Sequence, residues 1–140
     1  MNHPLPILVC ILTLAGAGAC GVSDKDSGGD AERYLAKPLA LGKPQPDKID
    51  GASDRTDWKV VELQDTGFLS LELSLDNPDA EVTLAVFDRF GKPVNRVSHR
   101  KGDGPVLKMT VEAGLGKYFV EVFAENRADA TGYTISARVK

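Results

Sequence analysis

The segment FLSLELSLD, residues 68–76, alternates apolar and polar side chains. Its leucines are separated by Ser70, Glu72 and Ser74. Because successive side chains of a β-strand point to opposite faces of the sheet, this pattern predicts a strand with one face in a core and the other toward water. The segment therefore favours a half-buried antiparallel sheet.

The same period of two recurs along the chain. Residues 82–88, 106–112 and 132–139 alternate in the same way, whereas KYFVEVFAE, residues 117–125, is apolar on nearly both faces, as in a central strand. Turn-forming residues separate these segments at 65–67, 76–79, 89–93, 101–105, 113–116 and 128–132. We therefore predict an all-β domain, an antiparallel β-sandwich of about seven to eight strands.

The N-terminus has a different composition. The apolar stretch LPILVCILTLAGAGAC, residues 5–20, is short for a membrane span and ends in small residues, as a secretory signal peptide does. Its last four residues resemble a bacterial lipobox, in which the cysteine is acylated and becomes the mature N-terminus. We predict a lipoprotein signal peptide over residues 1–19 and lipidation of Cys20. The alternatives are an ordinary secretory signal cut near Ala19 and a short membrane anchor.

The mature chain would keep Cys20 as its only cysteine, so no internal disulfide can form. Residues 20–36 are polar and rich in glycine and serine, which predicts a flexible tether. The folded domain is then expected over residues 37–140. Because Gly21 follows Cys20, the usual sorting preference of such lipoproteins favours the outer membrane of a bacterial envelope.

Three segments carry a resemblance to the bacterial pre-peptidase C-terminal domain family. They are DGASDRTDWKVVEL (50–63), VTLAVFDRFGKPV (82–94) and GKYFVEVFAENRADATGYTISARV (116–139). The family pattern has an Asp-Trp pair opening a strand, an Asp before a glycine turn, and two late Gly-Tyr strands. The resemblance covers residues 38–140 and implies a jelly-roll-like sandwich, usually an accessory module of secreted peptidases. Some members bind calcium, and others bind collagen or carbohydrate.

The resemblance leaves the calcium question open. Lys59 follows Trp58 where the family often has an aromatic residue, and Thr83 stands where an acidic residue is frequent. Carboxylates are still plentiful in the turns, and oxygen ligands suit calcium. The candidate metal ligands are Asp54, Asp57, Asp79 and Glu81. Their spacing fits no defined calcium loop, so we expect no cofactor, with calcium as the alternative.

Trp58 is the only tryptophan of the chain. We expect it to be a structural peg buried in the sandwich, with Asp57 holding the preceding turn through hydrogen bonds to the backbone. The alternative is an exposed platform that stacks on a sugar. Tyr118, Phe119 and Phe123 lie in a segment that is expected to be core.

A basic segment between residues 89 and 101 contains no acidic residue. It is either a solvated hairpin or a docking face for an anionic partner. The candidate partner-binding residues are Arg89, Lys92, Arg96, His99, Arg100 and Lys101. The net charge of -3 and the isoelectric point of about 5.4 argue against nucleic acid as a partner.

The sequence contains no recognisable catalytic motif, and His99 is the only histidine outside the signal peptide. We therefore expect a non-enzymatic envelope lipoprotein, held at the membrane by its lipid. Its sandwich would be a binding or assembly module for another envelope protein or a cell-wall polymer. The alternative is an accessory module that binds carbohydrate or calcium.

Overall fold

A computed structural model describes residues 28–140, so the predicted signal peptide and Cys20 lie outside the described residues. The regular elements are η1 (Arg33–Leu35), β1 (Lys37–Pro38), β2 (Gln45–Asp50), β3 (Thr56–Leu63), β4 (Gly67–Leu75), β5 (Val82–Phe87), β6 (Pro93–His99), β7 (Val106–Ala113), β8 (Gly116–Ala124) and β9 (Ala130–Val139). The predicted all-β class is thus confirmed. Within residues 28–140 no helix has the length and apolarity needed to cross a membrane.

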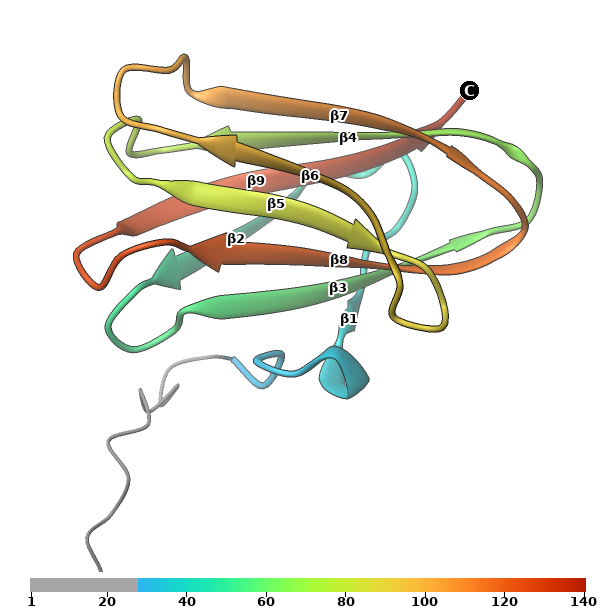
Figure 1. The fold of residues 1–140 in the computed structure, drawn as a ribbon, viewed down its shortest axis with the longest axis horizontal. Coiled ribbons are helices and arrows are strands. Elements are labelled where there is room, and N and C mark those ends of the chain that lie inside the picture. The colour runs from blue at the N-terminus through green and yellow to red at the C-terminus, as the bar shows by residue number, and fades with distance from the viewer. Residues whose placement is uncertain (1–27) are drawn as a thin grey trace, which may run out of the picture.

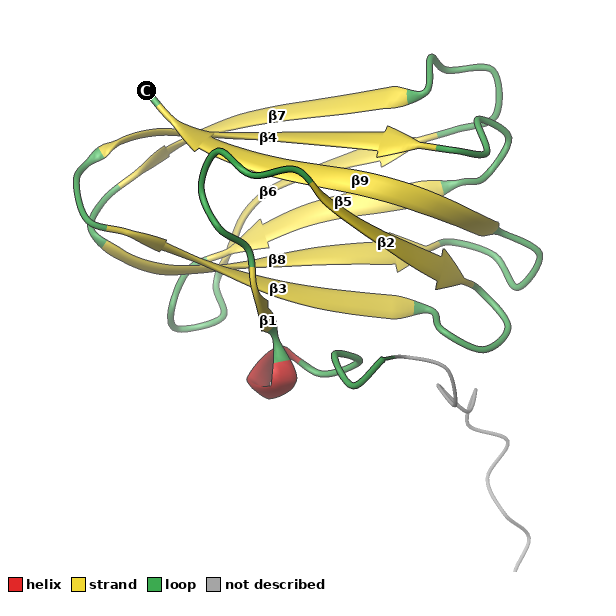
Figure 2. Ribbon diagram, turned by 180° about the vertical axis from the view of Figure 1, so that it is seen from behind, coloured by secondary structure: helices red, strands yellow, loops and turns green. Residues whose placement is uncertain are grey.

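The strands form two stacked sheets, seen from opposite sides in Figures 1 and 2. A five-stranded sheet has the order β1-β3-β8-β5-β6, and a four-stranded sheet has the order β2-β9-β4-β7. The short β1 runs parallel to β3, and the other pairs are antiparallel. The chain passes from one sheet to the other after most strands, which gives the predicted sandwich.

The core lies between the sheets and follows the alternation of the sequence. In β4 the four leucines are buried, and Ser70, Glu72 and Ser74 face outward. β7 and β9 contribute the same kind of row, of which Met109 and Ile135 are members. Burial of such a side chain contributes about 1.5–3 kcal/mol, so these rows hold the two sheets together without a disulfide.

Candidate functional site

The strand that contains Trp58 has the opposite orientation to the one expected. In β3 the buried side chains are Asp57, Lys59, Val61 and Leu63, which point between the sheets. Trp58 therefore lies half-buried on the outer face, where its ring packs against Phe87 with centroids 5.2 Å apart. The prediction of a peg inside the sandwich is wrong, because Val61 and Leu63 determine which face of β3 turns inward.

Lys59 is the centre of a buried polar cluster. Its side chain is 0% exposed, and its Nζ donates hydrogen bonds to Asp30 Oδ2 at 2.7 Å and to Asp47 Oδ2 at 2.5 Å. Asp47 belongs to β2, at the edge of the four-stranded sheet, and β3 lies next to the edge of the other sheet. The ammonium group thus joins the two sheets where their edges meet.

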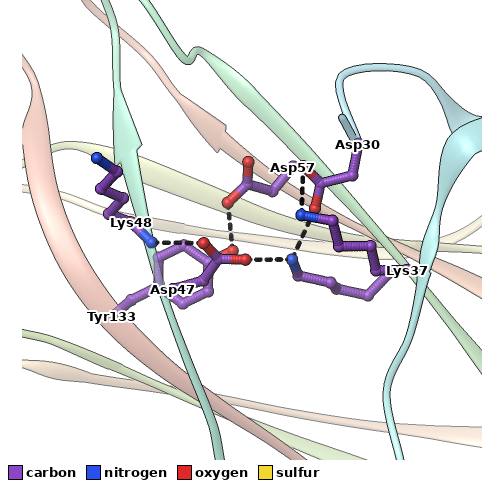
Figure 3. A network of polar contacts seen from close by, with 7 residues as sticks. Asp30, Lys37, Asp47, Lys48, Asp57 and Tyr133 are labelled. Atoms are coloured by element: carbon purple, nitrogen blue, oxygen red, sulfur yellow. Dashed lines mark hydrogen bonds and ion pairs between the residues drawn. The ribbon is translucent and has the colours of Figure 1, made fainter. Parts of the chain in front are cut away.

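Asp57 and Tyr133 complete the cluster, as Figure 3 shows. The Tyr133 hydroxyl donates a hydrogen bond to Asp57 Oδ2, and both side chains are buried. Burial raises the pKa of Asp57 to about 8; the Tyr133 hydrogen bond opposes this rise, and the charges of Asp54 and Asp30 add to it. Burial thus favours the protonated form of Asp57, and the hydrogen bond that it accepts comes from Tyr133 of β9 and not, as the sequence suggested, from the preceding turn.

The pKa shifts of Lys59 and Asp47 favour the charged form of each side chain and so strengthen the ion pair between them. Burial alone would raise the pKa of Asp47, but the hydrogen bond and charge of Lys59 outweigh burial and hold that pKa below its usual value. Burial likewise opposes the charged form of Lys59, and the hydrogen bonds to Asp30 and Asp47 outweigh it and raise the Lys59 pKa. The pair is ionised over the whole neutral range.

The cluster also fixes the segment that precedes β1. Asp30 is 1% exposed, and its backbone carbonyl accepts a hydrogen bond of 2.9 Å from the Trp58 N–H. Further along, the Leu39 N–H donates to Val60 O at 2.9 Å. Residues from Asp30 onward are therefore part of the fold, although the sequence placed the end of the tether at residue 36. The tether boundary needs this correction because Asp30 pairs with Lys59, which lies on a strand distant in sequence.

The predicted metal ligands do not form one site. Among residues 28–140, one group of three acidic side chains has ligand atoms within 4.8 Å of one another: Asp30, Asp47 and Asp57. Of the predicted set, only Asp57 belongs to this group. Asp54 pairs through its backbone with Asp50 in the β2–β3 turn. Asp79 lies exposed in a turn, and Glu81 accepts a hydrogen bond from Asn126 Nδ2 at 3.0 Å.

The three-carboxylate group does not fit calcium. Lys59 already donates hydrogen bonds to two of the three carboxylates, and burial raises the pKa of the third, Asp57, which disfavours its charged form. A calcium ion needs six to eight oxygen ligands and would lie beside the buried ammonium. The cationic group that neutralises these carboxylates is supplied by the protein itself.

The basic segment does not form a single docking face. Arg89 and Lys92 lie in the β5–β6 turn, whereas Arg100 and Lys101 lie in the turn at the other end of β6. A strand of this length separates its ends by roughly 20 Å. Arg96 lies between them on β6, opposite Ala85 of β5. The predicted set is thus divided between the two ends and the middle of one hairpin.

His99 is not available to a partner. It is 2% exposed, and its ring nitrogens lie 2.8 Å from Ala80 O and 2.9 Å from Gly104 O. Both nitrogens therefore contact backbone carbonyls, so His99 is neither part of a solvated hairpin nor a partner-binding residue, as the sequence suggested. The reason lies in the register, because His99 faces inward beside Val82.

The outer face of the five-stranded sheet carries aromatic side chains. Phe119 and Phe123 of β8 lie half-buried on this face rather than in the core, together with Trp58 and Phe87. Arginines stack on two of the rings: Arg33 is 5.5 Å from the Phe119 centroid and Arg55 is 4.7 Å from that of Phe123. Burial raises the pKa of Glu121 at the centre of this face.

The middle of the outer face of the four-stranded sheet is polar. A hollow of about 240 Å³ crosses β7, β4 and β9 on this face. Its polar lining comprises Ser70, Glu72, Lys108, Thr110, Ser136, Arg138 and Lys140. Ser70 Oγ and Thr110 Oγ1 lie 3.2 Å apart, and Lys108 Nζ lies 3.7 Å from Glu72 Oε2. The sequence showed that these positions face outward, but not that they surround one hollow.

Comparison with known proteins gives the fold. No protein-family model and no curated protein matches the sequence. The pre-peptidase C-terminal domain of collagenase from Bacillus anthracis superposes with a TM-score of 0.61 at 15% identity, over 74% of this chain and 94% of that domain. CorA, a surface-associated copper-binding protein of Methylomicrobium album BG8, gives 0.58 at 10% identity, over 75% and 98%.

A third structure is PliG of Aeromonas hydrophila, a periplasmic inhibitor of g-type lysozyme. It gives a TM-score of 0.50 at 12% identity, over 75% of this chain and 96% of that one. At such identities the likeness is one of fold. The protein thus has a β-sandwich with the fold of a pre-peptidase C-terminal domain, and the resemblance predicted from the sequence is confirmed at that level.

Proposed function

We propose that this protein is a non-enzymatic lipoprotein of a bacterial cell envelope whose sandwich binds a polar cell-wall polymer. Acyl chains on Cys20 would hold it at the membrane, and Gly21 favours the outer membrane. The observation that carries the binding role is the polar hollow on the four-stranded sheet. Its position on the outer face of the sheet leaves it open to a ligand outside the domain.

The chemistry of the hollow supports a polymer. Ser70, Thr110 and Ser136 offer hydroxyl groups, while Glu72 and Arg138 offer charges of both signs. Cell-wall polymers of amino sugars and short peptides carry hydroxyl, amide, carboxylate and ammonium groups that can pair with them. The hollow is smaller than the roughly 300–1,000 Å³ of an enclosed small-molecule pocket. A chain lying across the strands suits it better than an isolated small molecule.

Two further observations support this reading over its alternatives. Among residues 28–140 no aromatic side chain lines the hollow, so a polymer would be held there by hydrogen bonds and charges and not by the sugar stacking of a typical carbohydrate module. His99 is the one histidine among residues 28–140, and both its ring nitrogens contact backbone carbonyls. It is therefore not available as the general base that usually activates a serine or cysteine nucleophile. CorA is a surface-associated protein and PliG a periplasmic one, which supports the proposal of an envelope location for a chain with the same fold.

The anchor is tested by Cys20→Ser. We expect the variant to lose lipid labelling and to move from the membrane to the soluble fraction, because the thiol that carries the acyl chains is gone. Mass spectrometry of the mature N-terminus measures the modification directly. A mature chain that begins at residue 19, 20 or 21 without acyl chains would exclude a lipoprotein.

The binding face is tested by a double variant, Ser136→Ala with Arg138→Ala. We expect its affinity for isolated cell walls to fall by about tenfold or more, equivalent to about 1.4 kcal/mol. The matched control is Arg96→Ala with Ser98→Ala, the same pair of residue types on β6 of the opposite sheet. Equal binding by both double variants would refute the assignment of this face.

A further inference from the structure

Exposed apolar side chains gather where η1 meets the β5–β6 turn. Tyr34 is 82% exposed, Phe90 is 77% exposed and Leu35 is 46% exposed. η1 and the turn lie side by side in both Figure 1 and Figure 2. The Arg33 guanidinium fills the space beside Gly91, where an added Cβ would come within 1.7 Å of Nη1. We call Tyr34, Leu35 and Phe90 the edge patch.

The edge patch is held in place by the buried cluster. Asp30 is fixed by Lys59, and three residues later the Arg33 side chain lies over Phe119 and against Gly91. Gly91 has φ +83°, a conformation that favours glycine and leaves room for the guanidinium. Exposed aromatic residues are thus presented on a segment that is bound to the sandwich.

Basic side chains surround the edge patch. Arg33, Arg89 and Lys92 are exposed, and the Arg89 guanidinium lies 4.6 Å from the Phe90 ring centroid. The acidic residue of the same turn, Asp88, accepts hydrogen bonds from the N–H groups of Phe90 and Lys92 at 2.9 Å. Those bonds offset part of its negative charge, and the three cations outnumber Asp88 and the exposed Glu32 beside Arg33, so the surroundings of the patch favour an anionic surface.

We propose that the edge patch rests on the membrane and contacts anionic lipid headgroups, an inference that relies on the lipid anchor proposed above. Aromatic residues with an apolar body and a polar tip favour the membrane–water interface, and nearby arginine and lysine are attracted to anionic lipids. The polar hollow lies on the opposite sheet. Docking through the edge patch would leave that hollow free for an envelope partner.

The length of the tether supports a membrane rather than a protein as the occupant. The chain from Cys20 to Asp30 can span at most roughly 35 Å, so the patch remains within that reach of the bilayer that holds the acyl chains. Three side chains are too few for a protein interface of about 800 Å² per partner. They suffice for a weak membrane contact whose effective concentration the tether keeps high.

The test uses the lipidated protein in vesicles of phosphatidylethanolamine and phosphatidylglycerol. Because Cys20 is acylated and Cys10 is removed with the signal peptide, a nitroxide can be attached at Phe90→Cys and, as a control, at Lys101→Cys in the turn at the other end of β6. We expect the water-soluble relaxation agent to reach the label at position 90 about threefold less in the vesicles than in a detergent-free solution of the unanchored chain. The label at position 101 should be reached equally well in both. Added salt should weaken the protection at position 90.

A second pair of variants separates the patch from general apolar exposure. Tyr34→Ser with Leu35→Ser should remove the protection at position 90, whereas Phe68→Ser with Leu115→Ser should preserve it, although Phe68 and Leu115 are also exposed. A label at position 90 that stays as accessible as that at position 101, or is protected only by added envelope proteins, would overturn the inference. If Cys20 proves unmodified, the proposed anchor fails, and the patch is tested on the Cys20→Ser chain attached by its N-terminus to a chelating lipid.

Discussion

Replacing Lys59 with methionine is expected to lower the free energy of unfolding by about 3–5 kcal/mol, because it leaves buried carboxylates without their cation. Asp30 is 1% exposed and Lys59 bridges it to Asp47, so the lost contacts connect the two sheets and the N-terminal segment. Methionine keeps most of the volume, which limits the contribution of a cavity. Denaturant unfolding followed by circular dichroism measures the change.

A neutral version of the cluster is the control for this prediction. Lys59→Met combined with Asp30→Asn and Asp47→Asn removes both the ammonium and its two carboxylate partners. Such replacement of a whole buried ion pair is often close to neutral, so we expect most of the lost stability to return. If the triple variant is as unstable as Lys59→Met, the loss comes from packing and not from unpaired charge.

Calcium provides an independent check on the same variant. Without the ammonium, Asp30, Asp47 and Asp57 remain as acidic side chains within 4.8 Å of one another. Millimolar calcium should then raise the melting temperature of Lys59→Met, whereas it should shift the wild-type protein by less than about 3 °C. A large, chelator-sensitive shift of the wild-type protein would show that calcium does bind and that the ammonium does not exclude it.

The strands of this fold could be predicted because their outer and inner faces differ in sequence. The leucines of β4 and the row from Tyr133 to Ala137 in β9 alternate with polar residues, and their burial follows from that pattern alone. β2, QPDKID, has no such row, since its only buried side chain is Ile49. It was therefore missed as a strand.

The orientation of β3 could not be derived from local pattern. Trp58 and Val60 on one face compete with Val61 and Leu63 on the other, and the second choice also buries Asp57 and Lys59. Buried lysine and aspartate are rare unless they are paired. The partners of Lys59 lie on β2 and before η1. The buried face of β3 is therefore determined by contacts with other parts of the chain, which the sequence of the strand does not reveal.

The same lack of local information explains the candidate sites. Residues 89–101 contain basic and no acidic residues, but Arg89 and Lys101 lie at opposite ends of β6 and His99 faces inward. The edge patch is the opposite case, because its aromatic residues Tyr34 and Phe90 stand far apart in the sequence. Their elements, η1 and the β5–β6 turn, come together because Asp30 is fixed by Lys59 and Arg33 packs against Gly91.

Asp57→Asn is expected to change the pH dependence of stability. The folded-state pKa of Asp57 is raised to about 8 from an ordinary 3.8, so the folded state binds a proton that the unfolded state has released. This contribution is complete below pH 3.8 and is lost as the pH rises through about 8. The wild-type protein should lose stability over that interval, by at most about 1.4 kcal/mol per pH unit from this group.

Asparagine keeps an acceptor for the Tyr133 hydroxyl but cannot ionise, so the variant should lack this decline. Below the interval both proteins should lose stability together, because the lowered pKa of Asp47 makes its contribution disappear as the pH falls through the folded-state value.

Tyr133→Phe is the matched control. It removes the hydrogen bond that lowers the Asp57 pKa, so the decline should extend to higher pH than in the wild-type protein. The measurement is the free energy of unfolding of each protein from acid to mildly alkaline pH. Parallel pH profiles for the wild-type protein and Asp57→Asn would mean that Asp57 is already ionised within the core and would contradict this prediction.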